Sequence, residues 1–537
     1  MPVEIPVESI RKNACPRVFV YLLWAFPLVL AVMAGAFTVD GGFVQDDKAA
    51  IVQNALVVKE GIPLADFFRR DSWGFTEDGG IFVWRPLLPM IWRMVWAIHP
   101  GSPLLFRLLT ILLHLMATGM VLLLAHRFFR DRRVVWATGA LFAVHPLHAE
   151  ALGEIVGQAD ILAAFLGMLA VYVTLERHRV LTPLLVTLIL MAACLAKESA
   201  VIFSAVIAVA ALMPTRELAR KRMSVSLCAA LITIATILVQ LSFKRGGEGP
   251  LGNLAFAADG GMKVLHALYV IGRAVGMCFI PAGMSPFHDY AAVDLSLGTL
   301  LPYAIPGALF LCLGAGAFLI SLKKRSIAGL IGAGLLFGPI IINSSLIVPV
   351  GTELAERLLY PASAAACAMA ACFVYRIAGS RPGRVLAVVL ILLFSVQSYS
   401  AQRPWRTQLD LYAQGVEAEP LSARVHWYYG MNVLSGGDAL TAAWHFMAST
   451  YILKHFPNRV DPAPLLQLDQ LPVGQRLADG PAMFDPEDPC RFLNNYFQVL
   501  DRKTPNLAKY MRSLLLSRYQ KCGDRSSNQA PPAKPES

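Results

Sequence analysis

The feature that most constrains this chain is a series of apolar stretches separated by short basic clusters. The first begins after Arg17 and reaches about Val39, and about 20 apolar residues are enough for a helix to cross a bilayer. Of the 537 residues, 56% are hydrophobic and only 15% are charged. Because a soluble domain carries about 25% charged residues, an ordinary soluble enzyme, a coiled coil and a disordered chain are excluded. We expect an all-α chain that lies mostly in lipid.

The formal net charge of +11 raises the question of a nucleic-acid partner. The basic residues lie between the apolar runs, however, which is the pattern of cytoplasmic loops. The chain is therefore expected to bind the bilayer and no nucleic acid. The basic clusters are Arg11, Lys12 and Arg17; Arg127, Arg130, Arg132 and Arg133; Arg177 and Arg179; Arg216, Arg220, Lys221 and Arg222; Lys323, Lys324 and Arg325; and Arg376, Arg381 and Arg384.

Placing every basic cluster in the cytoplasm predicts about eleven transmembrane helices, with the N-terminus (1–17) inside and the C-terminus outside. The predicted cores are 18–39, 104–125, 134–146, 160–175, 181–196, 199–214, 223–243, 299–321, 327–348, 360–375 and 385–400. They form a transmembrane domain over 18–400. Several are shorter than the hydrocarbon core of about 30 Å, so the polar stretches after them are expected to line a cavity open to the outer face.

Two long external loops are expected, at 40–103 and 244–298. Segment 263–281 is apolar enough to cross the membrane, but counting it would move Lys323 and its neighbours outside. Lys263, His266 and Arg273 fall within one helical sector of about 80°, which favours a helix lying horizontally in the interface.

The composition changes after the last span. We expect an external helical domain over 401–522 and a disordered tail over 523–537. Segment 405–457 is typical of a helix, a turn at Gly436 and Gly437, and a second helix, a weak signal of a tetratricopeptide-like (TPR-like) repeat. Seven of the nine cysteines lie in or beside apolar stretches and are expected to pack there. Cys490 and Cys522 could form one disulfide with each other if that region faces an oxidising compartment.

Five ionisable clusters fall on the outer side of this topology, and charge near lipid is costly without partners or a function. They therefore predict one shared site. The clusters are FVQDDKAAI, HPLHAEALGEIVGQAD, LAKES, SPFHDY and GTELAERLLY.

Asp46 and Asp47 follow the first span and are candidates for a general base. Two adjacent carboxylates repel each other, which raises one pKa and keeps the other group ionised for proton abstraction. The alternative is a pair that caps a helix beginning at Lys48.

The remaining polar residues are candidates to bind a phosphate or a sugar. Of His145, His148, Glu150, Glu154 and Asp160, the two histidines and a carboxylate could ligate a metal, but ordinary polar lining that hydrogen-bonds phosphate or sugar is favoured. Lys197 with Glu198, and Glu356 with Arg357, could each close a loop as an ion pair. Alternatively Lys197, Arg357 and Arg85 supply cations to a lipid-linked phosphate. Arg107 is a further phosphate candidate, and Asp289 could shape an acceptor pocket. The chain has no Walker loop, GxGxxG, GxSxG or HExxH motif for a soluble nucleotide or a hydrolase.

Over about residues 18–460 the chain resembles the transmembrane and tetratricopeptide-repeat-containing (TMTC) branch of the GT-C glycosyltransferases, relatives of the protein O-mannosyltransferases. FVQDDKAAIVQNALV is similar to the first-loop di-acidic motif of that family, and ALFAVHPLHAEALGEIVGQADILAA to its HPxHxE…GxAD signature. CLAKESAV, VLHALYVIGRAVGMCFIPAGMSPFHDY, VPVGTELAERLLYPASA and RPWRTQLDLYAQGVEAEP match later segments.

The resemblance implies that Asp47 or Asp46 is the catalytic carboxylate. It also implies that the donor is a polyprenyl-phosphate sugar whose phosphate is held by cations such as Lys197, Arg357 or Arg85. Inversion of the anomeric centre and no obligatory metal or cofactor are expected, and a chelator that abolishes activity would overturn the second expectation. The family usually carries a longer repeat array, which leaves the acceptor open.

Three alternatives stay open at this level: transfer to a lipid or surface polysaccharide, a non-enzymatic transporter, and a membrane-anchored scaffold. The short loops favour a bacterial inner membrane, with the C-terminal domain in the periplasm.

Overall fold

The structure, a computed structural model, describes residues 17–74, 83–176, 181–211, 219–243, 260–281, 296–346 and 354–420, and parts of 284–287 and 422–449. Every regular element within these ranges is a helix. The predicted all-α class is therefore confirmed for the part of the chain that is described. Cys490, Cys522 and the predicted tail lie outside it.

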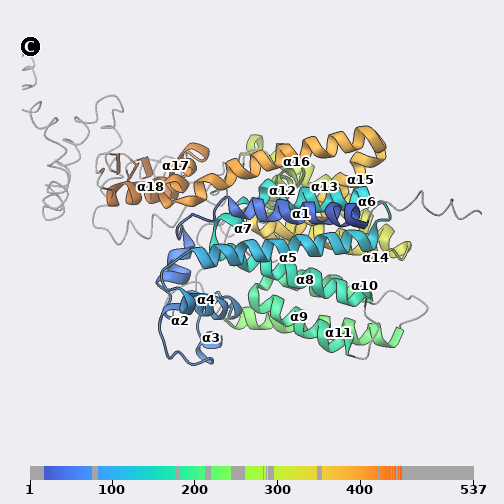
Figure 1. Ribbon diagram of the computed structural model, residues 1–537, viewed down its shortest axis with the longest axis horizontal. Coiled ribbons are helices and arrows are strands. Elements are labelled where there is room, and N and C mark those ends of the chain that lie inside the picture. The colour runs from blue at the N-terminus through green and yellow to red at the C-terminus, as the bar shows by residue number, and fades with distance from the viewer. Residues whose placement is uncertain are drawn as a thin grey trace, which may run out of the picture.

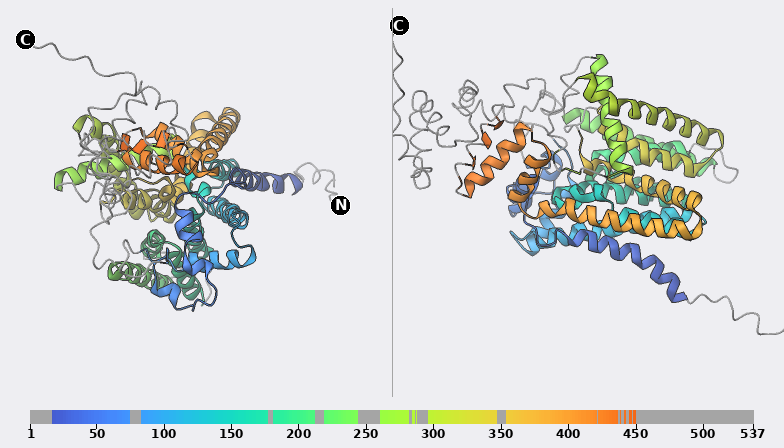
Figure 2. Two further views of the ribbon diagram at one scale, coloured as in Figure 1. Left: turned by 90° about the vertical axis from the view of Figure 1, so that its left-hand side faces the viewer. Right: turned by 90° about the horizontal axis from the view of Figure 1, so that it is seen from above.

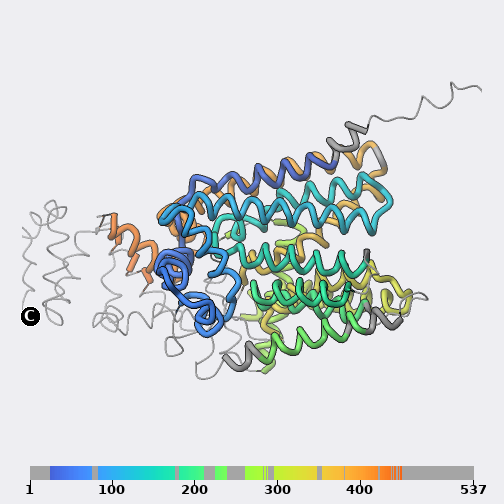
Figure 3. The backbone as a smooth tube through the Cα atoms, turned by 60° about the horizontal axis from the view of Figure 1, so that its bottom comes forward, coloured from blue at the N-terminus to red at the C-terminus, as the bar shows by residue number. Residues whose placement is uncertain are grey.

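A helix lies at each of the eleven predicted transmembrane positions. Figures 1 and 3 show α1, α5 and α16 running along the long axis of the molecule. The eleven helices are α1 (Arg17–Ala36), α5 (Leu104–Phe128), α6 (Arg132–Ala143), α8 (Gln158–Glu176), α9 (Thr182–Ala196), α10 (Val201–Ala211), α11 (Ala219–Phe243), α13 (Leu297–Lys323), α14 (Ile327–Asn343), α15 (Tyr360–Ala378) and α16 (Ser380–Gln402).

Six described helices are long and apolar enough to cross a bilayer, and they indicate a multi-pass membrane protein. They are Leu104–Phe128, Ile155–Leu175, Gly260–Phe279, Leu297–Lys323, Glu356–Ala378 and Arg381–Arg406. On α13 the outward side chains are apolar, with Ile305, Leu309 and Leu313 between 56% and 72% exposed. Such a surface suits lipid, because a helix satisfies its own backbone groups there.

Helix α12 (Gly260–Phe279) is the segment for which a horizontal position is predicted. It packs against α13 with backbone against backbone: a Cβ on Gly272 would lie 2.0 Å from the carbonyl oxygen of Tyr303, and one on Gly307 would lie 2.1 Å from that of Leu268. Only glycine fits at both positions. Its length and composition also suit a span, so the horizontal position stays a prediction.

The segments predicted as the first external loop and as the start of the C-terminal domain gather at one end of the molecule (Figures 1 and 2). The first of these segments holds α2 (Ala55–Val58), α3 (Asp66–Arg69) and α4 (Leu87–Ile98), and the second begins with α17 (Gln408–Ala418) and α18 (Ala423–Ser435). Val44, Phe287, Trp405 and Tyr412 form a buried cluster that joins these parts.

The C-terminal helices differ from the prediction in one respect. A single helix was expected before Gly436, but the chain breaks after Ala418 and restarts at Ala423. The hydroxyl of Ser422 accepts from the N–H of Val425 and starts α18 as an N-cap. The break follows from this cap. The sequence prediction for the segment did not include Ser422 as a helix start.

Candidate active site

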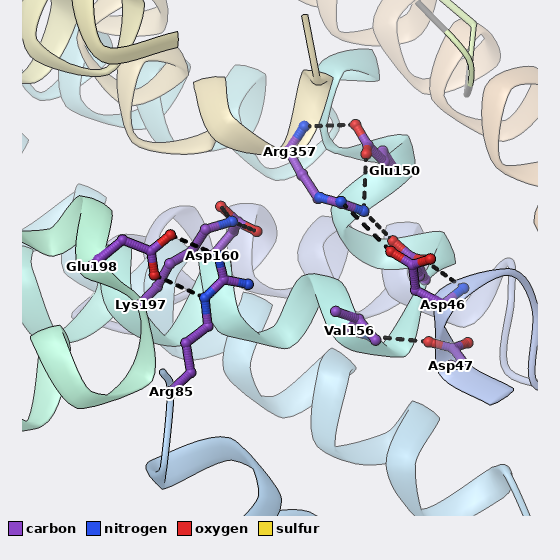
Figure 4. A network of polar contacts seen from close by, with 10 residues as sticks. Asp46, Asp47, Arg85, Glu150, Val156, Asp160, Lys197, Glu198 and Arg357 are labelled. Atoms are coloured by element: carbon purple, nitrogen blue, oxygen red, sulfur yellow. Dashed lines mark hydrogen bonds and ion pairs between the residues drawn. The ribbon is translucent and has the colours of Figure 1, made fainter. Parts of the chain in front are cut away.

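Irregular segments from four parts of the chain meet at the end of the bundle where α2, α3 and α4 lie (Figure 1). They are the loop before Lys48–Val52, the turns of 144–157, the turn Glu198–Ala200 and the turn Glu356–Leu359. Pro146 follows the last turn of α6, and short 3-10 turns at Pro146–His148 and Ile155–Gly157 replace continuous helix before α8. Figure 4 shows the charged side chains that these segments bring together.

Two ion pairs form the first group, which we call the paired cluster: Arg85, Asp160, Lys197 and Glu198. The Arg85 Nε and Nη2 atoms donate to the two Glu198 oxygens at 2.8 and 2.7 Å. Lys197 Nζ donates to both oxygens of Asp160 at 2.6 Å. The Lys197 and Asp160 side chains are 3% and 4% exposed. The cluster therefore holds two cations and two carboxylates.

The second group, which we call the acidic cluster, is built around the guanidinium of Arg357. Arg357 Nη1 contacts a Glu154 oxygen and lies 3.2 Å from Glu150 Oε1, and Nη2 lies 3.9 Å from Asp46 Oδ2. The Arg357 backbone N–H also donates to Glu150 Oε2 at 2.9 Å. One cation is thus shared among three carboxylates (Figure 4).

The two adjacent aspartates have different surroundings. The Asp46 side chain is 33% exposed beside Arg357. Asp47 is fully buried, and its oxygens accept from the backbone N–H groups of Val156 at 3.0 Å and Val44 at 3.2 Å. Asp47 precedes the short helical turn at Lys48 but makes no side-chain capping bond to it. The capping alternative is therefore wrong.

Burial dominates the electrostatics of the aspartate pair. It raises the pKa of Asp47 to about 7, against the opposing charge of Arg107 and the two backbone N–H groups. Burial also raises the pKa of Asp46, opposed by Arg357, Arg424 and Arg85 in that order. A carboxyl with a raised pKa holds a proton more readily near neutral pH.

The three cations of the two clusters act on one another. Burial lowers the pKa of Lys197, Asp160 opposes that shift, and the charges of Arg85 and Arg357 lower the pKa further. A cavity of about 20 Å³, room for about one water molecule, is bordered by Arg85 and by Val156, the backbone partner of Asp47. The two clusters therefore lie close enough for their charges to act on each other, and one shared site stays a prediction.

His145 and His148 lie in the helix bundle beside this site and bond protein atoms. Leu147 N–H donates to His145 Nδ1, so the other nitrogen of the neutral ring donates to the Cys278 carbonyl at 3.2 Å. His148 Nε2 lies 2.8 Å from the hydroxyl of Ser363. Both rings are buried. The described residues include no group of three or more His, Cys, Asp or Glu that could hold a metal ion.

Two other sequence candidates, Arg107 and Glu356, bond backbone groups. Arg107 is buried and donates to the carbonyl oxygens of Gly153 and Gly42, the latter at 2.6 Å. Glu356 is buried and accepts the Ser285 N–H at 2.9 Å. Asp289 lies outside the described residues.

The position that sequence reasoning undervalued is Glu154, which is fully buried between Arg357 and the loop that carries Asp46. Its signal was an ionisable residue in the HPLHAEALGEIVGQAD stretch.

Known proteins similar to this chain are named protein O-mannosyl-transferases. Tmtc1 of Drosophila melanogaster is 39% identical over 170 residues, which are 30% of this chain and 20% of that protein. A Caenorhabditis elegans relative is 25% identical and covers 77% of this chain and 60% of its own length. TMTC4 of Mus musculus is 26% identical and covers 82% of this chain and 68% of its own length. The predicted resemblance is confirmed, and the chain spans 60% or less of the first two relatives.

Comparison with protein-family models and with solved structures adds no family assignment. No protein-family model matches the chain. Among solved structures, the crystal structure of the Archaeoglobus fulgidus oligosaccharyltransferase, tethered to an acceptor peptide, aligns with a TM-score of 0.41 and 16% identity. It covers 75% of this chain and 59% of that chain.

Proposed function

We propose that this protein is a membrane glycosyltransferase that moves a mannose-like hexose from a polyprenyl-phosphate donor to a hydroxyl group of an acceptor protein. The observation that carries the proposal is the meeting of three cations and a half-exposed carboxylate, Asp46, at one end of a bundle of membrane-length helices. A donor in the lipid layer can reach such a site without a nucleotide-binding fold.

The cations of Arg85, Lys197 and Arg357 are proposed to hold the donor phosphate. Each is already paired with a carboxylate in the structure, so phosphate would take over donors that Glu198, Asp160 and Glu150 now occupy. Arginine offers two parallel donors to a phosphate, and lysine a compact charge.

Asp46 is proposed to act as the general base. Its carboxylate takes the proton of the acceptor hydroxyl, the hydroxyl oxygen bonds to the anomeric carbon, and the bond from that carbon to the phosphate oxygen breaks. The polyprenyl phosphate leaves with the bonding electrons, and attack opposite to it inverts the anomeric centre. Asp47 is unsuited to this role because it is fully buried and bonded on both oxygens.

The surplus of carboxylates around Arg357 suits the same reaction. The anomeric carbon gains positive charge as the phosphate leaves, and preorganised negative groups beside it lower the energy of that state. Asp46, Glu150 and Glu154 supply such groups around one cation. The three cations would then serve the leaving group, and the carboxylates of the acidic cluster the sugar.

The sugar and the acceptor class are proposed from the relatives, which are named protein O-mannosyl-transferases. We further propose that the site faces the periplasm of a bacterial inner membrane and that the helices after residue 401 guide the acceptor. The basic clusters of the sequence support this orientation.

The test is a transfer assay with the full-length protein in lipid nanodiscs. Polyprenyl-phosphate mannose, polyprenyl-phosphate glucose and GDP-mannose are each offered with a serine- and threonine-rich protein acceptor, and the modified acceptor is measured by mass spectrometry. We expect transfer from the polyprenyl-phosphate mannose alone. Transfer from the nucleotide sugar, or no transfer above empty nanodiscs from any donor, would contradict the proposal.

A further inference from the structure

We propose that Glu154 is a positioning residue that holds Asp46 in place for proton transfer, an inference that rests on the proposed function. Glu154 is fully buried, and each of its two oxygens bonds a different part of the site. Oε1 accepts the backbone N–H of Asp46 at 3.2 Å. Oε2 accepts from the guanidinium of Arg357.

The loop that carries Asp46 needs an external support. Gln45, directly before it, has a φ of +47°, in the left-handed region that residues other than glycine adopt at a cost. Such a conformation persists only where the surrounding contacts fix it. The N–H of the next residue is the group that Glu154 accepts, so the bond lies at the strained point of the loop.

The turn that carries Glu154 hydrogen-bonds to both aspartates, once as an acceptor and once as a donor. Glu154 accepts from the backbone of Asp46, and Val156, two residues later, donates its own N–H to the side chain of Asp47 at 3.0 Å. The turn is itself rigid: a Cβ on Gly157 would lie 2.5 Å from the carbonyl oxygen of Ala151. A fixed turn therefore sets the position of the di-acidic loop.

Glu154 also sets where Arg357 lies. The guanidinium contacts Glu154 through Nη1 and faces Asp46 through Nη2 at 3.9 Å. Without the Glu154 charge, Arg357 is free to close on Asp46 and neutralise it. Glu154 therefore holds Asp46 in place by accepting its backbone N–H. By holding the Arg357 guanidinium it also leaves the Asp46 carboxylate available to accept a proton.

The experiment compares Glu154→Gln and Glu154→Asp with wild type in the nanodisc transfer assay, with folding checked by size-exclusion chromatography. A base displaced by about 1 Å can lose about 100-fold in rate, so we expect kcat to fall by about 10- to 100-fold in both variants. The KM for the donor should rise by much less than kcat falls, because Arg85 and Lys197 still hold the phosphate. Glutamine keeps an acceptor but loses the charge, and aspartate keeps the charge but is too short to reach both partners.

A pH profile of Glu154→Gln separates positioning from a structural role. The charged groups that act on Asp46 are Arg357, Arg424 and Arg85, which lower its pKa, and the carboxylates of Asp47 and Glu154. With Arg357 released onto Asp46, the acidic limb of kcat should move to lower pH. The matched control is Asp131→Asn, which removes an exposed ion pair with Arg133 one helix length away on α6 and should leave kcat, KM and the limb unchanged.

The outcomes distinguish this inference from the proposed function. If wild type transfers no sugar, the proposed function fails. If wild type transfers sugar and a folded Glu154 variant matches it in kcat, or loses donor affinity instead, the inference fails while the function stands. If Glu154→Gln does not fold, the kcat and KM of Glu154→Asp decide.

Discussion

The paired cluster and the acidic cluster lie side by side at one end of the bundle, yet they balance charge in opposite ways. Arg85 and Lys197 each have a carboxylate of their own, whereas Arg357 serves Asp46, Glu150 and Glu154 together. The paired cluster carries as many cations as carboxylates, so a phosphate meets no excess of negative charge there. The acidic cluster carries such an excess, which suits a reaction centre that becomes positive. The contrast supports the proposal that Arg85 and Lys197 bind the phosphate and that the carboxylates around Arg357 serve the chemistry.

The largest effect is expected from Arg357→Gln, which breaks the acidic cluster. The substitution leaves two buried carboxylates, Glu150 and Glu154, without their cation, and losing one partner of a buried ion pair costs about 3–5 kcal/mol. Turnover should fall by about 100-fold or more. Thermal unfolding in detergent and the transfer assay measure the two effects. Near-normal stability would mean that Arg357 is not the shared partner.

Lys197→Met should destabilise the paired cluster by a similar 3–5 kcal/mol, because it strands the buried Asp160. Adding Asp160→Leu should restore most of the stability, since a buried ion pair is often replaceable by apolar residues. It should not restore donor binding. A double variant that binds donor normally would remove Lys197 from the proposed phosphate site.

Arg85→Gln should have a smaller and different effect. The Arg85 and Glu198 side chains are 20% and 36% exposed, so the stability change should be within about 1 kcal/mol. The KM for the donor should rise by about tenfold, the change expected when one charged contact to phosphate is lost, with kcat little changed. A fall in kcat at constant KM would place Arg85 with the chemistry instead.

The smallest expected effect is a shift in the pH dependence of kcat, which tests the carboxylates beside the acidic cluster. Burial raises the pKa of Asp47 to about 7 and also raises that of Asp46. Because a base must be ionised, kcat should be full at high pH and should fall on acidification as Asp46 takes up a proton, at a pH above the ordinary carboxyl range because burial raises the pKa of Asp46. Asp47→Asn removes a neighbouring negative charge, lowers the pKa of Asp46 and moves the limb to lower pH. An unmoved limb would show that the two carboxyls do not interact.

Sequence reading predicted the helices well because membrane helices depend on apolar length and basic flanks, which are local. It also brought Asp46, Lys197 and Arg357 to one end of the bundle. It did not pair Lys197 with Asp160, nor distinguish Asp46 from Asp47, because partners 37 residues apart and the burial of one neighbour depend on packing. His145 and His148 were placed among donor-binding candidates. Their hydrogen bonds to Cys278 and Ser363 come from distant helices and could not be foreseen.

The most direct test of the central claim is to compare sugar transfer by wild type, Asp46→Asn and Asp47→Asn proteins, with folding verified in each. A general base contributes about 100- to 10,000-fold, so the account predicts that wild type transfers mannose, Asp46→Asn loses at least 100-fold in kcat, and Asp47→Asn keeps a measurable fraction. An active Asp46→Asn variant beside an inert but folded Asp47→Asn variant would contradict it.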